Sequence, residues 1–230
     1  MTPRGEPLQA YVRWSYRAQS VSSHTMIRLA NNNTIPYSIS MEIAGLTVVG
    51  MGTAEWVNAL DNTELLAEPV AEQLRNLATL EPTLVSQALV SAIDPQFADT
   101  EAMTEHYAMD LNLSCNCVLV AGKREGEERV AAAVVRATTK ADVNHTIKKI
   151  LNVRKCSFWP QDKAVEASGM EYGGITPVGV PEAWNLLIDA RVAEGYCVVG
   201  SGLRRSKLAL PGALLAALPG AQVIEGLATE

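Results

Sequence analysis

The segment at residues 171–189 constrains the fold of this chain more than any other. Its sequence, EYGGITPVGVPEAWNLLID, places three glycines and two prolines around a single threonine. Gly173 and Gly174 can take positive φ and allow a ligand or a second backbone to approach closely, whereas Pro177 and Pro181 fix φ. We therefore interpret the segment as a pre-organised binding loop rather than a connector.

Two apolar runs follow this loop. The first, Leu186–Ile188, predicts a buried strand that ends on the carboxylate of Asp189. The second, Cys197–Val199, leads directly into another glycine cluster, Gly200-Ser201-Gly202. Each glycine-rich segment thus borders a predicted strand.

The rest of the chain shows an irregular mixture of strand and helix patterns. Strands are predicted at residues 46–49, 84–93, 115–121 and 130–137, and the sequence GKREGEE predicts a hairpin turn between the last two, which we expect to be central. Helices are predicted at residues 62–77, 99–109, 142–151, 161–167 and 211–218, with Asn62, Asp99 and Asp142 as N-caps. This mixture predicts an α+β fold, a single domain with a mixed, curved sheet flanked by helices.

Composition limits the class of protein. A chain of 230 residues with 48% hydrophobic and 19% charged residues can bury a full core. No apolar run approaches the roughly 20 residues that a membrane helix needs, so we expect no membrane partner. Four cysteines without a CxxC pair predict buried free thiols and a cytoplasmic protein, and neither they nor the three isolated histidines predict a metal site or a catalytic triad.

Residues 1–40 differ from the remainder. They are rich in Ser, Asn and Arg and follow neither the helical nor the strand period. We expect a disordered leader or a misassigned start, with Met41 opening the domain at residues 41–230.

Charge is unevenly distributed. Residues 1–40 carry four Arg and one Glu (+3), residues 41–110 one Arg and twelve acids (−11), and residues 111–230 fourteen bases and twelve acids (+2). Two basic clusters fall in the last part, Lys148, Lys149, Arg154 and Lys155 in one and Arg204, Arg205 and Lys207 in the other. Each can neutralise phosphates, and the first is equally well explained as a solvated helix face.

Four motifs together resemble a known family. The sequences GGITPVG, LLIDA, VVGSGLRRSKL and LPGALLAALPGA are similar to the YbaK/prolyl-tRNA synthetase-associated domain family of aminoacyl-tRNA editing deacylases, over about residues 95–228. The GxxxP-type loop of that family matches at Gly173 and Pro177. The resemblance implies hydrolysis of the ester that joins a wrong, small amino acid to the 3′ acceptor end of a tRNA. The tRNA for proline is one such substrate. It implies action in trans beside a synthetase, no cofactor or metal, and no binding of DNA.

The resemblance also suggests roles for individual residues. In the catalytic set, Gly173 and Gly174 would present N–H donors to the developing oxyanion, Thr176 would add a hydroxyl, and Asp189 would orient a substrate group unless it only caps its strand. The substrate-binding set is Ile175, Pro177, Gly179, Gly200, Ser201, Gly202 and Arg204. The tRNA-binding set is Lys148, Lys149, Arg205 and Lys207.

One position departs from the family. Such domains carry a Lys at the start of the first central strand, in a segment like VxKTLVF, and the segment SCNCVLV here places Asn116 at that position. Three explanations are open. Asn116 acts as a neutral oxyanion donor, another cation such as Lys207 or Arg204 reaches the same space, or the chain is a binding module that has lost the chemistry.

Overall fold

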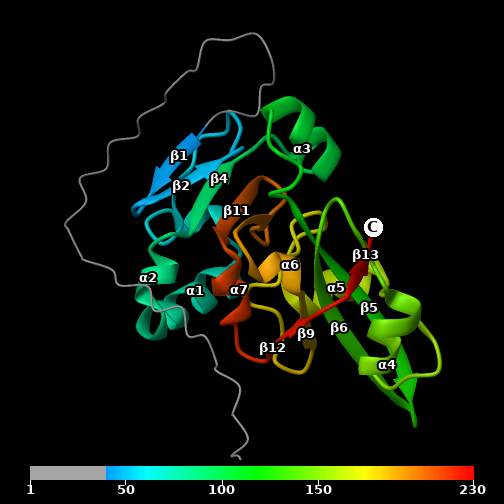
Figure 1. The fold of residues 1–230 in the computed structure, drawn as a ribbon. Coiled ribbons are helices and arrows are strands. Elements are labelled where there is room, and N and C mark those ends of the chain that lie inside the picture. Colours follow the sequence, from blue (N-terminus) through cyan, green and yellow to red (C-terminus); the bar gives the residue numbers. More distant parts are fainter. Residues whose placement is uncertain (1–39) are drawn as a thin grey trace, which may run out of the picture.

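The computed structural model describes residues 40–230. The expectation for residues 1–40 therefore lies outside the described residues, except at Ser40, which begins strand β1. Two sheets stand side by side with helices packed around them, as Figure 1 shows. This mixed α+β architecture is the one that the sequence predicts.

The larger sheet has five strands in the order β12-β9-β6-β5-β8. The predicted hairpin forms its centre, with β5 (Cys115–Arg124) and β6 (Glu127–Arg136) antiparallel around a turn at Glu125 and Gly126, both at positive φ. The parallel strands are β9 (Asn185–Asp189), beside β6, and β12 (Ala221–Ile224), beside β9. The edge strand β8 (Cys156–Phe158) is antiparallel to β5.

The smaller sheet has four strands in the order β10-β11-β4-β3. Its members are β10 (Tyr196–Gly200), β11 (Ser206–Pro211), β4 (Leu89–Ala92) and β3 (Val57–Asn58). Two further pairs are β1 (Ser40–Ile43) with β2 (Leu46–Val49), and β7 (Lys140–Ala141) with β13 (Ala228–Thr229). A bridge between Ser114 and Val198 brings the start of β5 alongside β10 and so joins the two sheets.

Helices occupy the connections. They are α1 (Glu68–Leu80), α2 (Pro82–Val85), α3 (Thr100–Tyr107), α4 (Lys148–Ile150), α5 (Gln161–Ser168), α6 (Ala190–Ala193) and α7 (Gly212–Ala216). Single turns are the 3₁₀ segments η1 (Thr63–Leu65) and η2 (Pro95–Phe97) and the π-type turn η3 (Val143–Ile147).

Three sequence predictions need correction. The helix predicted from Asn62 begins only at Glu68, because Leu66 is extended and Pro69 fits the first helical turn, where its missing N–H costs nothing. The strand predicted at residues 84–93 begins at Leu89, since α2 occupies its first part. Asp99 precedes α3 but makes no side-chain cap, whereas Asp142 accepts two backbone N–H groups at the start of η3, as predicted.

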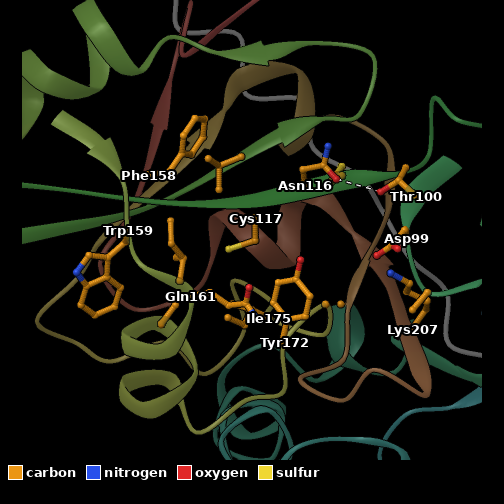
Figure 2. A pocket seen from close by; sticks show the side chains of 17 residues that line it. Asp99, Thr100, Asn116, Cys117, Phe158, Trp159, Gln161, Tyr172, Ile175 and Lys207 are labelled. Atoms are coloured by element: carbon orange, nitrogen blue, oxygen red, sulfur yellow. Dashed lines mark hydrogen bonds between the residues drawn. The ribbon is translucent and has the colours of Figure 1, made fainter. Parts of the chain in front are cut away.

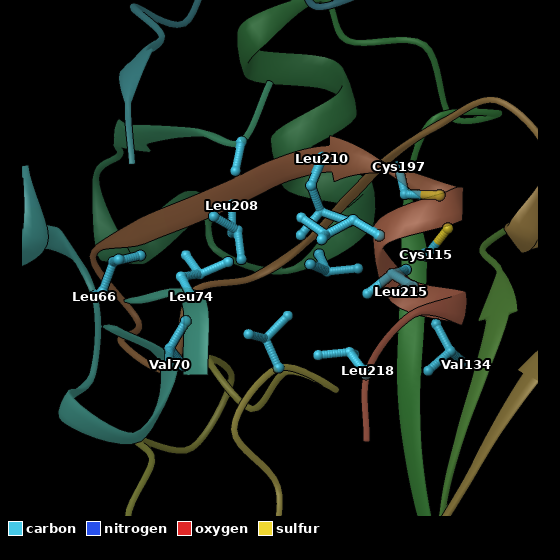
Figure 3. Packing of buried hydrophobic residues seen from close by; sticks show 14 of the residues in the cluster. Leu66, Val70, Leu74, Cys115, Val134, Cys197, Leu208, Leu210, Leu215 and Leu218 are labelled. Carbon is cyan, nitrogen blue, oxygen red and sulfur yellow. The ribbon is translucent and has the colours of Figure 1, made fainter. Parts of the chain in front are cut away.

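The main core lies between the sheets and the helices α1 and α7. Figure 3 shows part of it, where Leu208 and Leu210 of β11 meet Leu74 of α1 and Leu215 of α7. Strand β6 is buried on both faces, because its even-numbered residues pack in this core and its odd-numbered residues in another beneath η3 and α4. Burial on both faces explains the unbroken apolar run at residues 130–135.

Candidate active site

A pocket of about 510 Å³ opens between the two sheets. It is bounded by β5, the end of β8, the start of α5, the glycine loop after α5, and the facing ends of β10 and β11. Figure 2 shows Trp159 and Gln161 at one end of the pocket and Asn116 and Lys207 at the other. The volume lies within the range of small-molecule sites, so the pocket can enclose a small ligand.

The pocket exists because β8 covers only part of β5. β8 pairs with Val120–Gly122, and beyond that point β5 has no partner on this side until the bridge at Ser114. The carbonyl of Leu119 still accepts the N–H of Trp159 (2.9 Å). Since backbone groups alternate in direction along a strand, the N–H and C=O of Cys117 face the same open edge. They are therefore available to a bound substrate.

The glycine loop supplies two further donors. Gly173 and Ile175 line the pocket, and neither N–H donates to an acceptor within residues 40–230. Gly174 is different, because its N–H is donated to the carbonyl of Glu171 (2.9 Å) and its Cα packs against the backbone of Leu203. Of the two predicted oxyanion donors, Gly173 has a free N–H, whereas Gly174 holds the loop against the second glycine turn; Ile175, predicted only to bind substrate, has the other free N–H.

The second glycine turn is mostly structural. Gly200 lines the pocket, and a Cβ there would collide with the carbonyl oxygens of Gly174 and Ile175. Ser201 is fully buried and its hydroxyl bonds to the hydroxyl of Ser206 (2.7 Å). Gly202, at φ +85°, packs against α1 and donates its N–H to the carbonyl of Gly174 (2.8 Å). Of the predicted binding residues in this turn, only Gly200 reaches the pocket.

Asn116 lies in the pocket wall, at the position predicted for it. Its amide oxygen accepts the hydroxyl of Thr100 (3.1 Å), which fixes the amide plane. Within the described part of the chain no acceptor takes the amide N–H groups, so Asn116 keeps an unused neutral donor. Its side chain also lines another hollow, together with Val118 and Val135.

Lys207 enters the same pocket from the opposite sheet. In β11 the leucines 208 and 210 face the main core, and the strand alternation therefore turns Lys207 the other way, toward the opening. Burial lowers the pKa of Lys207 to about 8, although nearby Asp99 raises it and Arg204 lowers it further. Lys207, which the sequence analysis assigned to tRNA binding, is thus a cation of the pocket. It lines the same pocket as Asn116, which is uncharged.

Arg204 does not line the pocket but contacts two residues that do, Asp99 and Tyr172. Its guanidinium pairs with the carboxylate of Asp99 (3.4 Å) and lies 5.9 Å from the centre of the Tyr172 ring. Its backbone N–H donates to the carboxylate of Glu171 (2.7 Å), which ties the two glycine segments together. Arg204 therefore shapes the pocket mouth.

Asp189 points away from the pocket and is 1% exposed. Its carboxylate accepts the backbone N–H of Arg191 (3.0 Å), the guanidinium of the same residue (2.8 Å) and the N–H of Ala228 (3.0 Å). Burial opposes its ionisation, but the hydrogen bonds from Arg191 and Ala228 outweigh this effect and hold the pKa of Asp189 below its usual value. The structure thus favours the strand-end cap over the substrate-orienting role.

The remaining predicted residues lie outside the pocket lining. Thr176 is completely buried, and its hydroxyl has no partner among the described residues. Pro177 is buried, and Gly179, at φ +80°, packs against the first turn of α1. Arg205 is exposed and donates to the carbonyl of Glu64 (2.9 Å). Lys148 and Lys149 lie on α4.

Sequence reasoning missed much of the pocket wall. The additional lining residues come mainly from β5, β8 and the segment before α3, and they include Asp99, Thr100, Cys117, Phe158, Trp159, Gln161 and Tyr172. The available sequence signal was the position of the aromatic residues, with Phe158 and Trp159 before Pro160 and Tyr172 before the glycine pair. Burial raises the pKa of Cys117 to about 12, so its thiolate is scarce at neutral pH and it is a poor nucleophile.

The described residues contain no cluster of His, Cys, Asp and Glu suited to a metal ion, and the four cysteines are free thiols. Across residues 40–230 no helix has the length and apolarity to span a membrane.

Comparison with known proteins identifies the class. Residues 94–218, just over half of the chain, match the family model of the aminoacyl-tRNA editing domain. The chain belongs to this family. No curated protein matches the sequence.

Two solved structures share the fold. One is a candidate trans-editing enzyme for prolyl-tRNA synthetase, with a TM-score of 0.54 and 16% identity over 69% of this chain and 97% of that one. The other is a hypothetical protein, with a TM-score of 0.56 and 15% identity over 68% of this chain and 99% of that one. At such identities the likeness is one of fold.

Proposed function

We propose that this protein is an aminoacyl-tRNA deacylase that acts in trans and hydrolyses the ester of a mischarged small amino acid, with tRNA for proline as the first candidate. The observation that carries the proposal is the pocket itself. It gathers an amide donor, two loop N–H groups and a cation from segments that are far apart in sequence. The neighbour described as an editing enzyme for prolyl-tRNA synthetase motivates the choice of tRNA and the action in trans.

Water is the only co-reactant in the proposed hydrolysis. A water oxygen adds to the ester carbonyl carbon and negative charge develops on the carbonyl oxygen. The bond to the ribose oxygen then breaks, this oxygen takes the proton that the attacking water gives up, and free amino acid and tRNA leave. The protein accelerates this sequence if pre-positioned donors meet the oxyanion, and the N–H groups of Gly173 and Ile175 together with Asn116 can do so.

Lys207 supplies the charge that the family places on β5. Of the three explanations for Asn116, the geometry supports a combination of the first two, with a neutral donor on β5 and an ammonium group on β11 facing one cavity. Arg204 is less suited to this task because Asp99 already neutralises it. We also place this activity in the cytoplasm, where four unpaired thiols remain reduced.

The proposal is tested by incubating the purified protein with alanyl- and cysteinyl-tRNA for proline and with correctly charged prolyl-tRNA, and by following loss of the acyl bond. We expect release of the small, wrong amino acid and protection of the proline ester. Lys207→Met should reduce turnover by about 100-fold, as removal of an oxyanion partner does elsewhere. The matched control is Arg75→Met, at an exposed position on α1 outside every predicted binding set, which should keep the parent rate.

Two outcomes would oppose the proposal. If no charged tRNA is hydrolysed but binding persists, the chain is a silent module that binds aminoacyl-tRNA or a free amino acid. If hydrolysis occurs and Lys207→Met leaves it unchanged, the cationic role assigned to Lys207 is wrong and Asn116 acts alone.

A further inference from the structure

A groove continues from the active-site pocket along the edge strand β8. A second hollow of about 480 Å³ shares Phe158 and Trp159 with the pocket. A third, of about 440 Å³ at the tip of the β5–β6 hairpin, shares Lys123 and Arg154 with the second. The three hollows are therefore neighbours along this edge of the sheet, and we refer to the second and third together as the β8 groove.

We propose that the β8 groove binds the single-stranded 3′ end of the tRNA and so delivers the acylated ribose to the pocket. This inference rests on the proposed function. The acylated nucleotide is the last of the chain, so the nucleotides before it must leave the pocket mouth along an adjoining surface.

The charge of the groove suits a polyanion. Its lining contains five basic residues and two acidic ones, a net charge of +3. Two of the bases are paired, Lys163 with Glu128 (3.5 Å) and Arg124 with Glu125 (3.2 Å). The other three form no ion pair within residues 40–230 and are exposed to solvent, namely Lys123, Arg154 and Lys155. They are available to phosphates.

The opposite side of the pocket repels the same ligand. Residues 94–110, which include α3, contain five acidic residues and neither Lys nor Arg. Among the acids, Asp99 lines the pocket and Glu101 and Glu105 are exposed on α3. A phosphate backbone that leaves the pocket is therefore directed away from α3 and toward β8.

Phe158 adds a stacking surface where the pocket meets the groove. Its side chain lines both hollows and is 72% exposed, which is unusual for a large apolar residue. The neighbouring Trp159 is held in place, since its indole N–H donates to Glu128 (3.3 Å) and its ring packs edge-on against Trp184. An exposed aromatic ring beside unpaired cations is the combination that binds unpaired bases and their phosphates.

The binding test uses a fluorescent, uncharged RNA hairpin with a short single-stranded 3′ tail, and the same hairpin without the tail. We expect the tail to strengthen binding and Phe158→Ala to weaken it about tenfold, within the range for loss of one base stack. The double variant Arg154→Glu/Lys155→Glu should weaken binding. A plot of the logarithm of its association constant against the logarithm of salt concentration should be less steep, by about 0.7 for each phosphate that the variant no longer neutralises. Thermal melts must show that each variant is folded.

Arg75→Glu is the control for charge alone, because Arg75 is exposed on α1, lines neither the pocket nor the groove and belongs to none of the predicted binding sets. We expect it to bind RNA as the parent does. Equal weakening by Arg75→Glu, equal affinity for the tailless hairpin, or unchanged affinity of the folded groove variants would each overturn the proposal.

A kinetic measurement separates this inference from the proposed function. Arg154→Glu/Lys155→Glu should lower kcat/KM for aminoacyl-tRNA and leave hydrolysis of 3′-aminoacyl adenosine unchanged, because that fragment does not extend into the groove. Equal losses on both substrates would contradict the groove. If the parent hydrolyses neither substrate but the groove variants still lose tail-dependent binding, the proposed function fails and the groove assignment stands.

Discussion

Lys207 is the residue on which the chemistry depends most. As a charged partner of the oxyanion it must be protonated, and burial lowers its pKa to about 8, with Asp99 raising it and Arg204 lowering it. Turnover should therefore be maximal below pH 8 and fall as the pH rises through that value. The measurement is the enzyme-dependent rate of deacylation against pH, after subtraction of spontaneous ester hydrolysis.

Lys207→Met controls for the substrate, whose own amino group titrates in the same range. The variant should lose the fall above pH 8 if Lys207 causes it. A parent rate that rises through pH 8 would instead identify the neutral amine as a base and contradict the assignment.

Asp189, in contrast to Lys207, is predicted to affect stability rather than catalysis. Asp189→Asn should lower the free energy of unfolding by about 2 kcal/mol, because hydrogen bonds to a charged group are worth roughly 1.5–3 kcal/mol. The folded pKa is depressed, so the stabilisation is present above the ordinary pKa of an aspartate and is lost as the pH falls below it. Chemical denaturation at neutral and acidic pH measures both effects.

The same variant tests the catalytic assignment. If Asp189 only connects β9 to Arg191 and Ala228, the folded variant keeps the parent turnover. A stable variant with greatly reduced turnover would restore the substrate-orienting role.

Among the structural elements, the glycine loop is defined by its contact with the second glycine turn. A Cβ on Gly174 would lie 2.5 Å from the carbonyl carbon and 2.8 Å from the nitrogen of Leu203, both backbone atoms. Gly174→Val should therefore lower the free energy of unfolding by about 1–3 kcal/mol, the range for overpacking. Thermal and urea unfolding measure this loss.

Gly220→Val is a useful comparison, since a Cβ there meets no atom within 4 Å and only its positive φ opposes the change. We expect the Gly174 variant to be the less stable of the two. A normal melt for Gly174→Val with blocked activity would show that the position acts on the substrate directly, as the sequence suggested.

For the whole molecule, the arrangement of sheets predicts where stability is concentrated. Strand β6 is central and buried on both faces, whereas β8 is an edge strand of three residues with exposed side chains. Amide hydrogens of residues 130–135 should exchange most slowly and those of Cys156–Phe158 much faster. Hydrogen exchange followed by mass spectrometry checks this order, and equal rates in the two strands would contradict the core described above.

The sequence by itself determined the central strands β5, β6 and β9 of the larger sheet with their hairpin, the two glycine segments and the family, but not the edge strands β8 and β12. These features depend on local signals, because an apolar run such as 130–135, a turn such as Glu125-Gly126 and a cap such as Asp142 act through near neighbours. The start of α1 was predicted too early. The apolar helical period already begins at Leu65, whereas the helix starts at Glu68, with Pro69 in its first turn.

Only the tertiary structure decided which residues share the pocket. Lys207 and Asn116 come from strands in different sheets, and nothing in their spacing of about ninety residues brings them together. The sheet arrangement also brought the N–H of Ala228 to the carboxylate of Asp189 and left part of β5 unpaired. Long-range packing of two sheets fixes such contacts, and the periodicity of a single chain segment contains no information on the neighbour it will meet.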